Sequence, residues 1–441
     1  MAHVALPVGG MPAEQASARA VRLTATASLI GTTIEWYDFI LYTSLAGLIF
    51  NKLFFPADNP VVSLMLAYAT FAVGFVTRPV GGAFFGHFGD RLGRKPLLVL
   101  TLTMMGVATF LIGLIPTYAA IGIAAPIMMV ILRLVQGFAM GGEWGGAVLM
   151  AFEYAPPERR GFYACFPQIG FGLGLCLSTG AITLLSSLLS DEAFLAWGWR
   201  CAFFVSILLL ALGLFVRLKL FETPEFEQIR DSYHVSRLPL GVVAREYGGN
   251  VLLGLLARLG EGGVFTVYAF YMLPYLTGIV GLPRTLVLSS VTIAALVLIF
   301  TVPLASAWSD HVGRRKLFAI ATLVNGVAAF PLLWMLQSGS PLLAALAIIV
   351  SLGILWAPIY GPEAALFCEL FDTRVRYTGV SLVYQFGAII FLAPVPILAT
   401  LLVAWNGNRP WYLATYLLIA CIISAIATGL MRRTFGGPAE H

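Results

Sequence analysis

The sequence carries little charge for its length. Of its 441 residues, 11% are charged and 59% are hydrophobic, and the mean hydropathy is +0.90, whereas ordinary globular domains contain roughly 25% charged residues. This composition excludes a soluble globular protein and predicts an integral membrane protein. Helices are expected, because lipid offers no hydrogen-bond partner to unpaired backbone groups.

The sequence also lacks the motifs of several function classes. Its five cysteines lie in or beside apolar runs, which predicts packing residues rather than a disulfide framework. It has no cysteine or histidine pair at metal-ligand spacing, no Gly-x-Ser-x-Gly nucleophile turn and no ATP-binding domain. We therefore expect no metal site and no enzymatic activity. The net charge of +5 is attributed to membrane topology and anionic headgroups, so no nucleic-acid partner is expected.

Long apolar runs fill most of the chain. They divide into about twelve segments, each long enough to cross a hydrocarbon core about 30 Å thick. The predicted spans are residues 22–50, 61–85, 96–116, 120–149, 162–187, 198–220, 247–277, 285–307, 317–337, 341–368, 377–404 and 409–432. The predicted organisation is an N-terminal tail (1–21), a first six-helix bundle (22–220), a connector (221–246), a second six-helix bundle (247–433) and a C-terminal tail (434–441).

One polar loop occurs twice. Residues 86–96 read GHFGDRLGRKP and residues 306–316 read SAWSDHVGRRK, so Asp90 and Arg94 return as Asp310 and Arg314. Such a duplication predicts two homologous membrane halves with a substrate site at their interface. The expected fold is an all-α membrane protein of twelve transmembrane helices in two pseudo-symmetric six-helix bundles.

Basic residues indicate the orientation. Most of the 26 lysines and arginines fall in the two tails and in the even-numbered connections between spans. The positive-inside rule therefore predicts that both termini are cytoplasmic.

Several motifs resemble those of a known family. The paired Asp-x-x-Gly-Arg-Arg/Lys loops, the stretch from Arg133 to Gly137, and Glu153 followed by Arg160 resemble the major facilitator superfamily. The stretches EWYDF at 35–39, RPVGG at 78–82 and GGEWGG at 141–146 are similar to its metabolite:proton symporter branch.

Within that branch, LSTG at 177–180 and FLAWGWR at 194–200 are most similar to the shikimate-type members. The resemblance implies a secondary transporter of the bacterial cytoplasmic membrane. It would work as a monomer, with the proton as coupling ion and no other cofactor.

Ionisable residues inside the spans are the candidate functional residues, because each costs at least about 2.5–3.5 kcal/mol near a bilayer centre. The helical rise places Glu35, Asp38 and Arg133 about 18–24 Å deep, close enough in depth to meet near the midplane. Arg78 and Glu143 lie about 9–11 Å deep and form a second layer. In the second half, Arg258 and Glu261 are three residues apart and share a helix face.

These positions suggest roles. Asp38 is the first candidate for the coupled proton, Glu35 the second and Glu261 the third. Arg133 or Arg258 would hold an organic anion, because a guanidinium can meet a carboxylate with two hydrogen bonds. The candidate aromatic lining of the substrate site is Trp36, Tyr37, Trp144, Tyr268 and Tyr271.

Structural alternatives exist for each role. Glu35, Asp38 and Arg133 could form a static buried network, Arg258 and Glu261 could simply neutralise each other, and the aromatic residues could be packing or lipid-facing residues.

The resemblance also implies cytoplasmic gating contacts. Asp90 and Arg94, with the neighbouring Arg91, and Asp310 with Arg314 would tie helices together in the outward-facing state. Further latches are expected from Glu153 with Arg160, from Glu369 with Arg376, and from Arg78 with Glu143. The alternative is a plain positive-inside anchor, which explains the basic residues but not the aspartates before them.

The leading functional hypothesis is proton-coupled uptake of a small organic acid by alternating access, with the organic anion and the lipid bilayer as partners. Alternatives are uptake of a zwitterionic osmolyte such as proline or betaine, export of a drug or metabolite, and a membrane receptor without net transport. An integral-membrane enzyme is the least favoured alternative.

Overall fold

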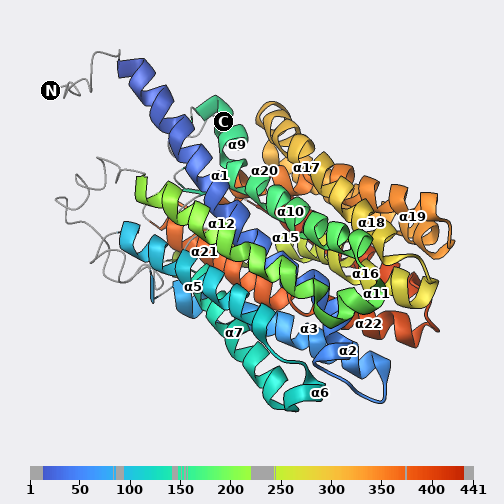
Figure 1. The fold of residues 1–441 in the computed structure, drawn as a ribbon. Coiled ribbons are helices and arrows are strands. Elements are labelled where there is room, and N and C mark those ends of the chain that lie inside the picture. The colour runs from blue at the N-terminus through green and yellow to red at the C-terminus, as the bar shows by residue number, and fades with distance from the viewer. Residues whose placement is uncertain are drawn as a thin grey trace.

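The computed structural model describes residues 13–82, 84–85, 94–141, 148–149, 151–152, 155, 157–219, 243, 245–372 and 375–431. These residues form helices joined by turns, with no strand among them. In Figure 1 the long helices run roughly parallel, with α1 and α9 near one end and α2, α6 and α11 near the other. We call the first the terminal end, because α1 (Ala13–Leu45) begins there, and the second the distal end.

The helices of the first half cover the first six predicted spans. After α1, the chain continues through a π-helical turn, η1 (Ala46–Phe50), into α2 (Asn51–Leu53). The other elements are α3 (Pro60–Val76), α5 (Arg94–Leu114), α6 (Tyr118–Ile121), α7 (Ala124–Met140), η2 (Pro157–Arg159), α9 (Arg160–Ala164), α10 (Phe166–Leu188), α11 (Asp191–Ala193), η3 (Phe194–Gly198) and α12 (Trp199–Lys219).

The helices of the second half cover the remaining six spans. They are α15 (Gly248–Thr266), η4 (Val267–Tyr271), α16 (Met272–Pro274), η5 (Tyr275–Val280), α17 (Arg284–Val312), α18 (Arg314–Gln337), α19 (Pro341–Ile348), η6 (Ile349–Leu355), α20 (Ala357–Cys368), α21 (Arg376–Gly387), η7 (Ala388–Leu392), α22 (Val395–Trp405) and α23 (Trp411–Leu430).

The membrane character of the fold is confirmed. Within the described residues, nine helices are long and apolar enough to cross a membrane, and Val99–Leu114 and Ala124–Met140 are shorter apolar helices. Together with α1 they occupy the twelve predicted spans. α1 begins at Ala13, inside the predicted N-terminal tail, because a helix can continue beyond its apolar part. Most of the predicted connector and the whole predicted C-terminal tail lie outside the described residues.

Local sequence signals set several helix starts at the distal end. The Asn59 side chain accepts a hydrogen bond from the N–H of Val61 at 2.9 Å, and α3 begins at Pro60. Ser340 similarly precedes α19, which begins at Pro341. Asparagine and serine cap free N–H groups, and proline needs no donor at the first helical position, so both sequences favour a helix start.

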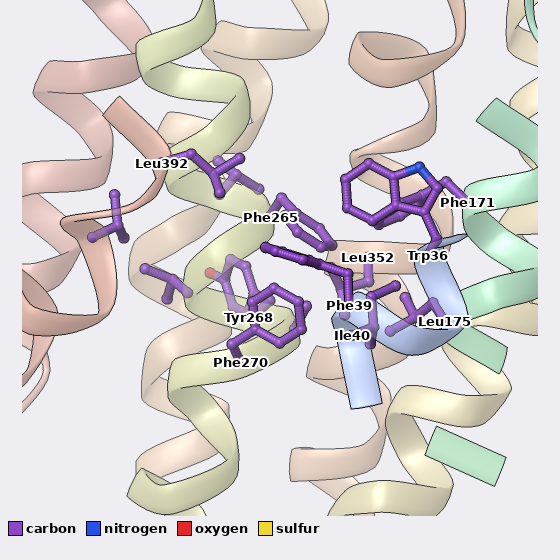
Figure 2. Packing of buried hydrophobic residues seen from close by; sticks show 14 of the residues in the cluster. Trp36, Phe39, Ile40, Phe171, Leu175, Phe265, Tyr268, Phe270, Leu352 and Leu392 are labelled. Carbon is purple, nitrogen blue, oxygen red and sulfur yellow. The ribbon is translucent and has the colours of Figure 1, made fainter. Parts of the chain in front are cut away.

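The two halves pack along α10 with α17 and along α3 with α22. In the candidate span of α15, 72% of the apolar window is buried, against 50% or less in the other candidate spans, so α15 is the most enclosed. Figure 2 shows the aromatic layer at this interface. The ring of Phe171 in α10 lies 5.1 Å from that of Phe265 in α15, and Phe71 lies 5.9 Å from Phe270. This layer keeps the charged groups nearby away from water.

A hydrogen bond to a carbonyl that a proline leaves free links the halves toward the distal end. Pro274 has no N–H, so the carbonyl of Phe270 loses its ordinary helical donor four residues later. The hydroxyl of Tyr68 in α3 donates to this carbonyl at 3.3 Å. Gly47 makes the approach possible, because a Cβ at that position would lie 2.5 Å from the Tyr68 Oη atom.

Glycines also set the crossing of α3 and α7. A Cβ on Gly137 would lie 1.9 Å from the carbonyl oxygen of Gly74, and a Cβ on Gly141 would lie 1.9 Å from that of Arg78. The opposing atoms belong to the backbone and cannot rotate away. Close helix contact through small residues is a common way for membrane helices to associate.

Replacing Gly137 by alanine is therefore expected to separate α3 from α7 and to destabilise the protein by about 3 kcal/mol. The measurement is the thermal unfolding midpoint of the detergent-purified protein. Gly180→Ala is the control, because its Cβ would meet Thr292 at an ordinary 3.6 Å. Equal midpoints for the two variants would contradict a tight crossing at Gly137.

Candidate functional site

Two buried arginines of the first half stack on one aromatic ring. Arg78 lies just after α3 and Arg133 lies in α7, and the guanidinium carbon of each is 4.4 Å from the ring centre of Phe39. Arg78 is 2% exposed and Arg133 is 0% exposed. Counting along the helix did not predict this shared ring, because it ignores the reach of a long side chain.

Arg133 has only uncharged hydrogen-bond partners in the described part of the chain. One Nη atom donates to Oε1 of Gln136 at 2.9 Å, and the other donates to the carbonyl of Phe71 at 3.4 Å. The Nε atom has no partner among the described residues. The ring of Tyr42 lies 4.2 Å from the guanidinium carbon. These contacts hold the charge in place without neutralising it.

Asp38 is fully buried, and neither of its carboxyl oxygens has a hydrogen-bond partner among the described residues. Thr109 of α5 lies beside it. The Thr109 hydroxyl donates to the carbonyl of Met105 at 2.9 Å and accepts from Nε2 of Gln136 at 2.7 Å, so its proton is not available to Asp38.

The structure thus places Asp38 and Arg133 in one polar region, with Thr109 and Gln136 linking them, but no direct ion pair is found between the two described side chains. Glu35, one helical turn before Asp38, is also buried, at 7% exposure, and interacts electrostatically with Asp38 and Arg78.

The second half contains a closed ionic cluster. An Nη atom of Arg258 lies 2.9 Å from Oε2 of Glu261 and also contacts Oε1 of Glu363 in α20. All three side chains are 3% exposed or less. The ring of Tyr384 in α21 lies 4.4 Å from the guanidinium carbon. The predicted contact between Arg258 and Glu261 is present, and a second acid completes it.

Sequence reasoning missed Glu363, although the signal was available. Glu363 is an acid inside the apolar run 341–368, and intramembrane acids are functional candidates by default. Tyr384 was also missed. It interacts electrostatically with Arg258 and, across the interface between the halves, with Arg78, and no sequence pattern distinguishes it from other buried tyrosines.

The predicted aromatic lining is corrected in one place. The hydroxyl of Tyr37 donates to the carbonyl of Ala202 in α12 at 2.7 Å, so its side chain points into the first half. Trp36, the preceding residue on the helix, points about 100° away, and its ring lies 4.7 Å from that of Phe171. Tyr268 and Tyr271 are buried in the second half, and the Tyr268 hydroxyl has no partner among the described residues.

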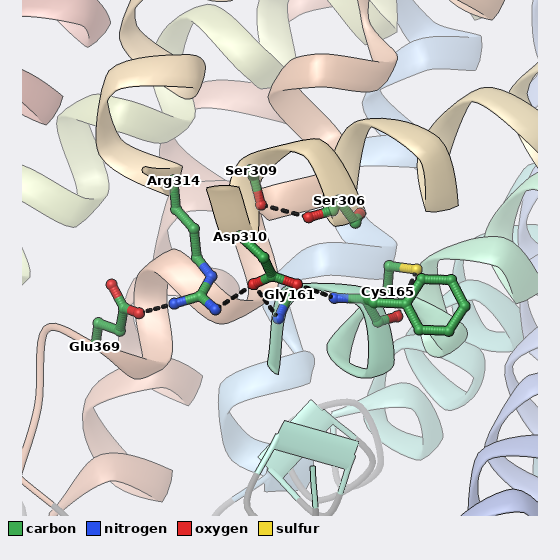
Figure 3. Close-up of polar contacts among 8 residues, drawn as sticks. Gly161, Cys165, Ser306, Ser309, Asp310, Arg314 and Glu369 are labelled. Atoms are coloured by element: carbon green, nitrogen blue, oxygen red, sulfur yellow. Dashed lines mark hydrogen bonds and ion pairs between the residues drawn. The ribbon is translucent and has the colours of Figure 1, made fainter. Parts of the chain in front are cut away.

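A polar network joins the halves at the terminal end (Figure 3). Asp310 in α17 accepts hydrogen bonds from the backbone N–H groups of Gly161 at 2.9 Å and Phe162 at 3.1 Å. Arg314 contacts both Asp310 and Glu369. The structure therefore brings together three of the predicted gating residues.

Two further predicted gating residues share one ring. The guanidinium of Arg160 lies 4.9 Å and that of Arg376 lies 5.6 Å from the ring of Phe152. Of Arg94, the structure describes only the helix that it begins. The remaining predicted site residues, which lie outside the described residues, are Asp90, Arg91, Glu143, Trp144 and Glu153.

The chemistry available at the interface is the binding of protons and anions. Within the described ranges, no group of three or more histidine, cysteine, aspartate or glutamate side chains could hold a metal ion. The interface offers buried guanidiniums with spare donors and buried carboxyls with spare acceptors.

Comparisons with known proteins agree with this layout. The family profile described as Major Facilitator Superfamily matches residues 28–394. The chain is 39% identical to the shikimate transporter of Escherichia coli (strain K12) over 414 residues, covering 93% of this chain and 94% of that protein. It is 41% identical to the inner membrane metabolite transport protein YhjE of the same strain over 378 residues, covering 85% and 86%.

A solved structure shares the fold. The partially occluded inward-open conformation of the xylose transporter XylE from E. coli matches with a TM-score of 0.72 at 16% sequence identity, covering 95% of this chain and 99% of that chain.

The network around Asp310 generates a prediction about Cys165, which is fully buried beside it. Asp310→Ala removes the acceptor of two backbone N–H groups and one partner of Arg314. In a background with the other cysteines replaced by serine, we expect a small maleimide to label Cys165 about tenfold faster, which corresponds to about 1.4 kcal/mol of lost contact energy. Glu192→Gln, an exposed change at the distal end, should leave the labelling rate unchanged. An unchanged rate in Asp310→Ala would show that the network does not hold the terminal end together.

Proposed function

Because the chain belongs to the major facilitator superfamily, we propose that it takes up a small organic acid together with a proton across the bacterial cytoplasmic membrane by alternating access. The chain is an integral multi-pass membrane transporter and not an enzyme. The proton and the acid are inferred from the buried charges of the first half.

The observation that carries the proposal is that Asp38 and Arg133 are both fully buried and that neither has an oppositely charged partner in contact among the described residues. An isolated charge inside a protein costs several kcal/mol. Asp38 avoids this cost when it binds a proton. Arg133 cannot lose its charge, so the group that would compensate it is an anion, and a guanidinium is well shaped to receive a carboxylate.

The same arrangement explains how binding of the proton could be coupled to binding of the organic acid. Asp38 and Arg133 share the polar region around Thr109 and Gln136. An ionised Asp38 would partly cancel the positive field of Arg133, and a protonated Asp38 leaves that field available to a substrate carboxylate. Coupling then requires only that the outward-open and inward-open states differ in their affinity for the proton and the acid.

Contacts between the halves at both ends suit alternating access. At the distal end, Arg284 of α17 lies 2.6 Å from Asp191 of α11, and Tyr68 contacts Phe270. At the terminal end, Asp310 binds the start of α9. Each set would break in turn as the halves rock.

The substrate class and orientation follow from similarity and charge. The relative that is 39% identical is named a shikimate transporter, and a compound of that kind carries the carboxylate that Arg133 would bind. The distribution of basic residues supports a cytoplasmic location for the terminal end. Since one chain contains both halves, a monomer would suffice, with no cofactor besides the proton.

Transport by the reconstituted protein tests the proposal. Proteoliposomes with an imposed inward proton gradient would be given labelled shikimate, α-ketoglutarate, proline and betaine. We expect one of the acids to accumulate about tenfold per pH unit, the ratio for one proton carried with one negative charge. Asp38→Asn and Arg133→Ala should both abolish this accumulation, because each removes one of the two binding groups.

Glu192→Gln is the matched control for a carboxyl change outside the interface, and it should transport like the unmodified protein. Equal accumulation without a gradient would refute symport. Accumulation of proline or betaine in place of the acids would favour the zwitterion alternative. Uptake that survives both Asp38→Asn and Arg133→Ala would refute the assigned site.

A further inference from the structure

The ionic cluster of the second half contains more acid than base. Arg258 and Glu261 lie in α15, Glu363 lies in α20, and all three are at most 3% exposed. With both carboxylates ionised, one guanidinium and two carboxylates would leave a net charge of −1 in an apolar bundle. Such an uncompensated buried charge is costly.

The excess negative charge is located around a single atom of Arg258. The same Nη atom of Arg258 contacts Oε2 of Glu261 at 2.9 Å and Oε1 of Glu363. The two carboxyl groups are therefore close neighbours, and one shared proton removes their repulsion. Oε2 of Glu363 has no hydrogen-bond partner among the described residues, so it has room for a hydrogen.

Among the described residues, Arg258 is the base that contacts this pair. The other titratable groups that act on the cluster there are Tyr384 of α21, Tyr360 of α20 and Arg78 of the first half, which interacts electrostatically with Arg258 and Tyr384. Tyrosines are neutral at ordinary pH. The contact from α23 is the uncharged hydroxyl of Ser424, which accepts from the N–H of Gly260 at 2.7 Å.

We infer that Glu261 and Glu363 hold one proton between them, and that this proton must be present before an organic anion can bind at the interface. This proton site is additional to Asp38 and involves Glu363, to which no role has been given above. The second part of the inference rests on the proposed function.

The order of binding follows from charge. With the proton in place the cluster is neutral and does not oppose an incoming carboxylate. Without the proton the cluster is negative, and its charge reaches the first half, where Arg78 interacts electrostatically with Arg258 and Tyr384. Raising the pH through the titration of the pair therefore weakens anion binding, by about tenfold per pH unit for one linked proton.

Infrared spectroscopy tests the proton without any substrate. In an Asp38→Asn background, which removes the other proposed proton site, the detergent-purified protein at neutral pH should show the carbonyl stretch of a protonated carboxyl group. Adding Glu363→Gln should remove this band, because Glu261 and Arg258 alone form a neutral pair. Glu261→Gln should remove the same band and serves as a second variant if the first does not fold. Glu192→Gln should leave the protonated-carboxyl band unchanged. Spectra in which Glu363→Gln leaves that band as unchanged as Glu192→Gln does would overturn the inference.

The pH dependence of binding tests the order, with shikimate as the probe acid. In an Asp38→Asn background, which removes the other proposed proton site, the dissociation constant should rise about tenfold per pH unit above the titration midpoint. Adding Glu363→Gln should make the constant independent of pH.

The outcomes separate this inference from the proposed function. A flat pH profile in Asp38→Asn alone, or a steep profile that survives Glu363→Gln, would overturn the binding order. If the unmodified protein binds no organic acid, the proposed function fails, and the infrared result still decides whether the pair holds a proton.

Discussion

A guanidinium group keeps its charge at any physiological pH, so every arginine buried in a membrane must find compensation. Arg78, Arg133 and Arg258 are all buried, and the protein compensates them in two ways. Arg258 is enclosed by two glutamates, whereas Arg78 and Arg133 rest on aromatic faces that attract a cation without removing its charge. The buried base of the second half is therefore neutralised by acids of the same half, and the first half retains positive charge that can act on a ligand.

The aromatic layer between the halves makes these charges effective. Phe39 contacts two guanidiniums, and Phe171 packs on Phe265 of the other half. Because such a layer excludes water, electrostatic interactions inside it are stronger than at the surface. The ionic contacts at the two ends, through Asp310 and through Arg284, lie outside the layer, and the Asp191 partner of Arg284 is exposed to water. This division suits a molecule in which the ends open while the centre keeps its charges dry.

Hydropathy and helical spacing were sufficient to predict the twelve spans and the contact between Arg258 and Glu261, because both depend on residues close in sequence. They were not sufficient to predict contacts that depend on side-chain direction or on residues distant in sequence. Glu363 meets Arg258 across a separation of 105 residues, and Tyr37 turns into the first half although its neighbour Trp36 faces the interface. Arg78 and Arg133 reach the same ring from different helices. Each of these depends on how helices pack, which the periodicity of one segment does not contain.

The two halves of the chain have opposite charges on their corresponding helices. The first helix of the first half has the acid Asp38 and its fourth helix, α7, has the base Arg133. In the second half, α15 is the corresponding first helix and has the base Arg258, and α20 completes the corresponding fourth helix and has the acid Glu363. The base and acid touch in the second half and remain apart in the first. One repeat thus completes its ion pair internally, whereas the other leaves a gap that, in the proposed mechanism, a proton and an external carboxylate would fill together. A substrate anion would take the place in the first half that Glu363 occupies in the second, which is why the unpaired half is the one expected to change its charge state during transport.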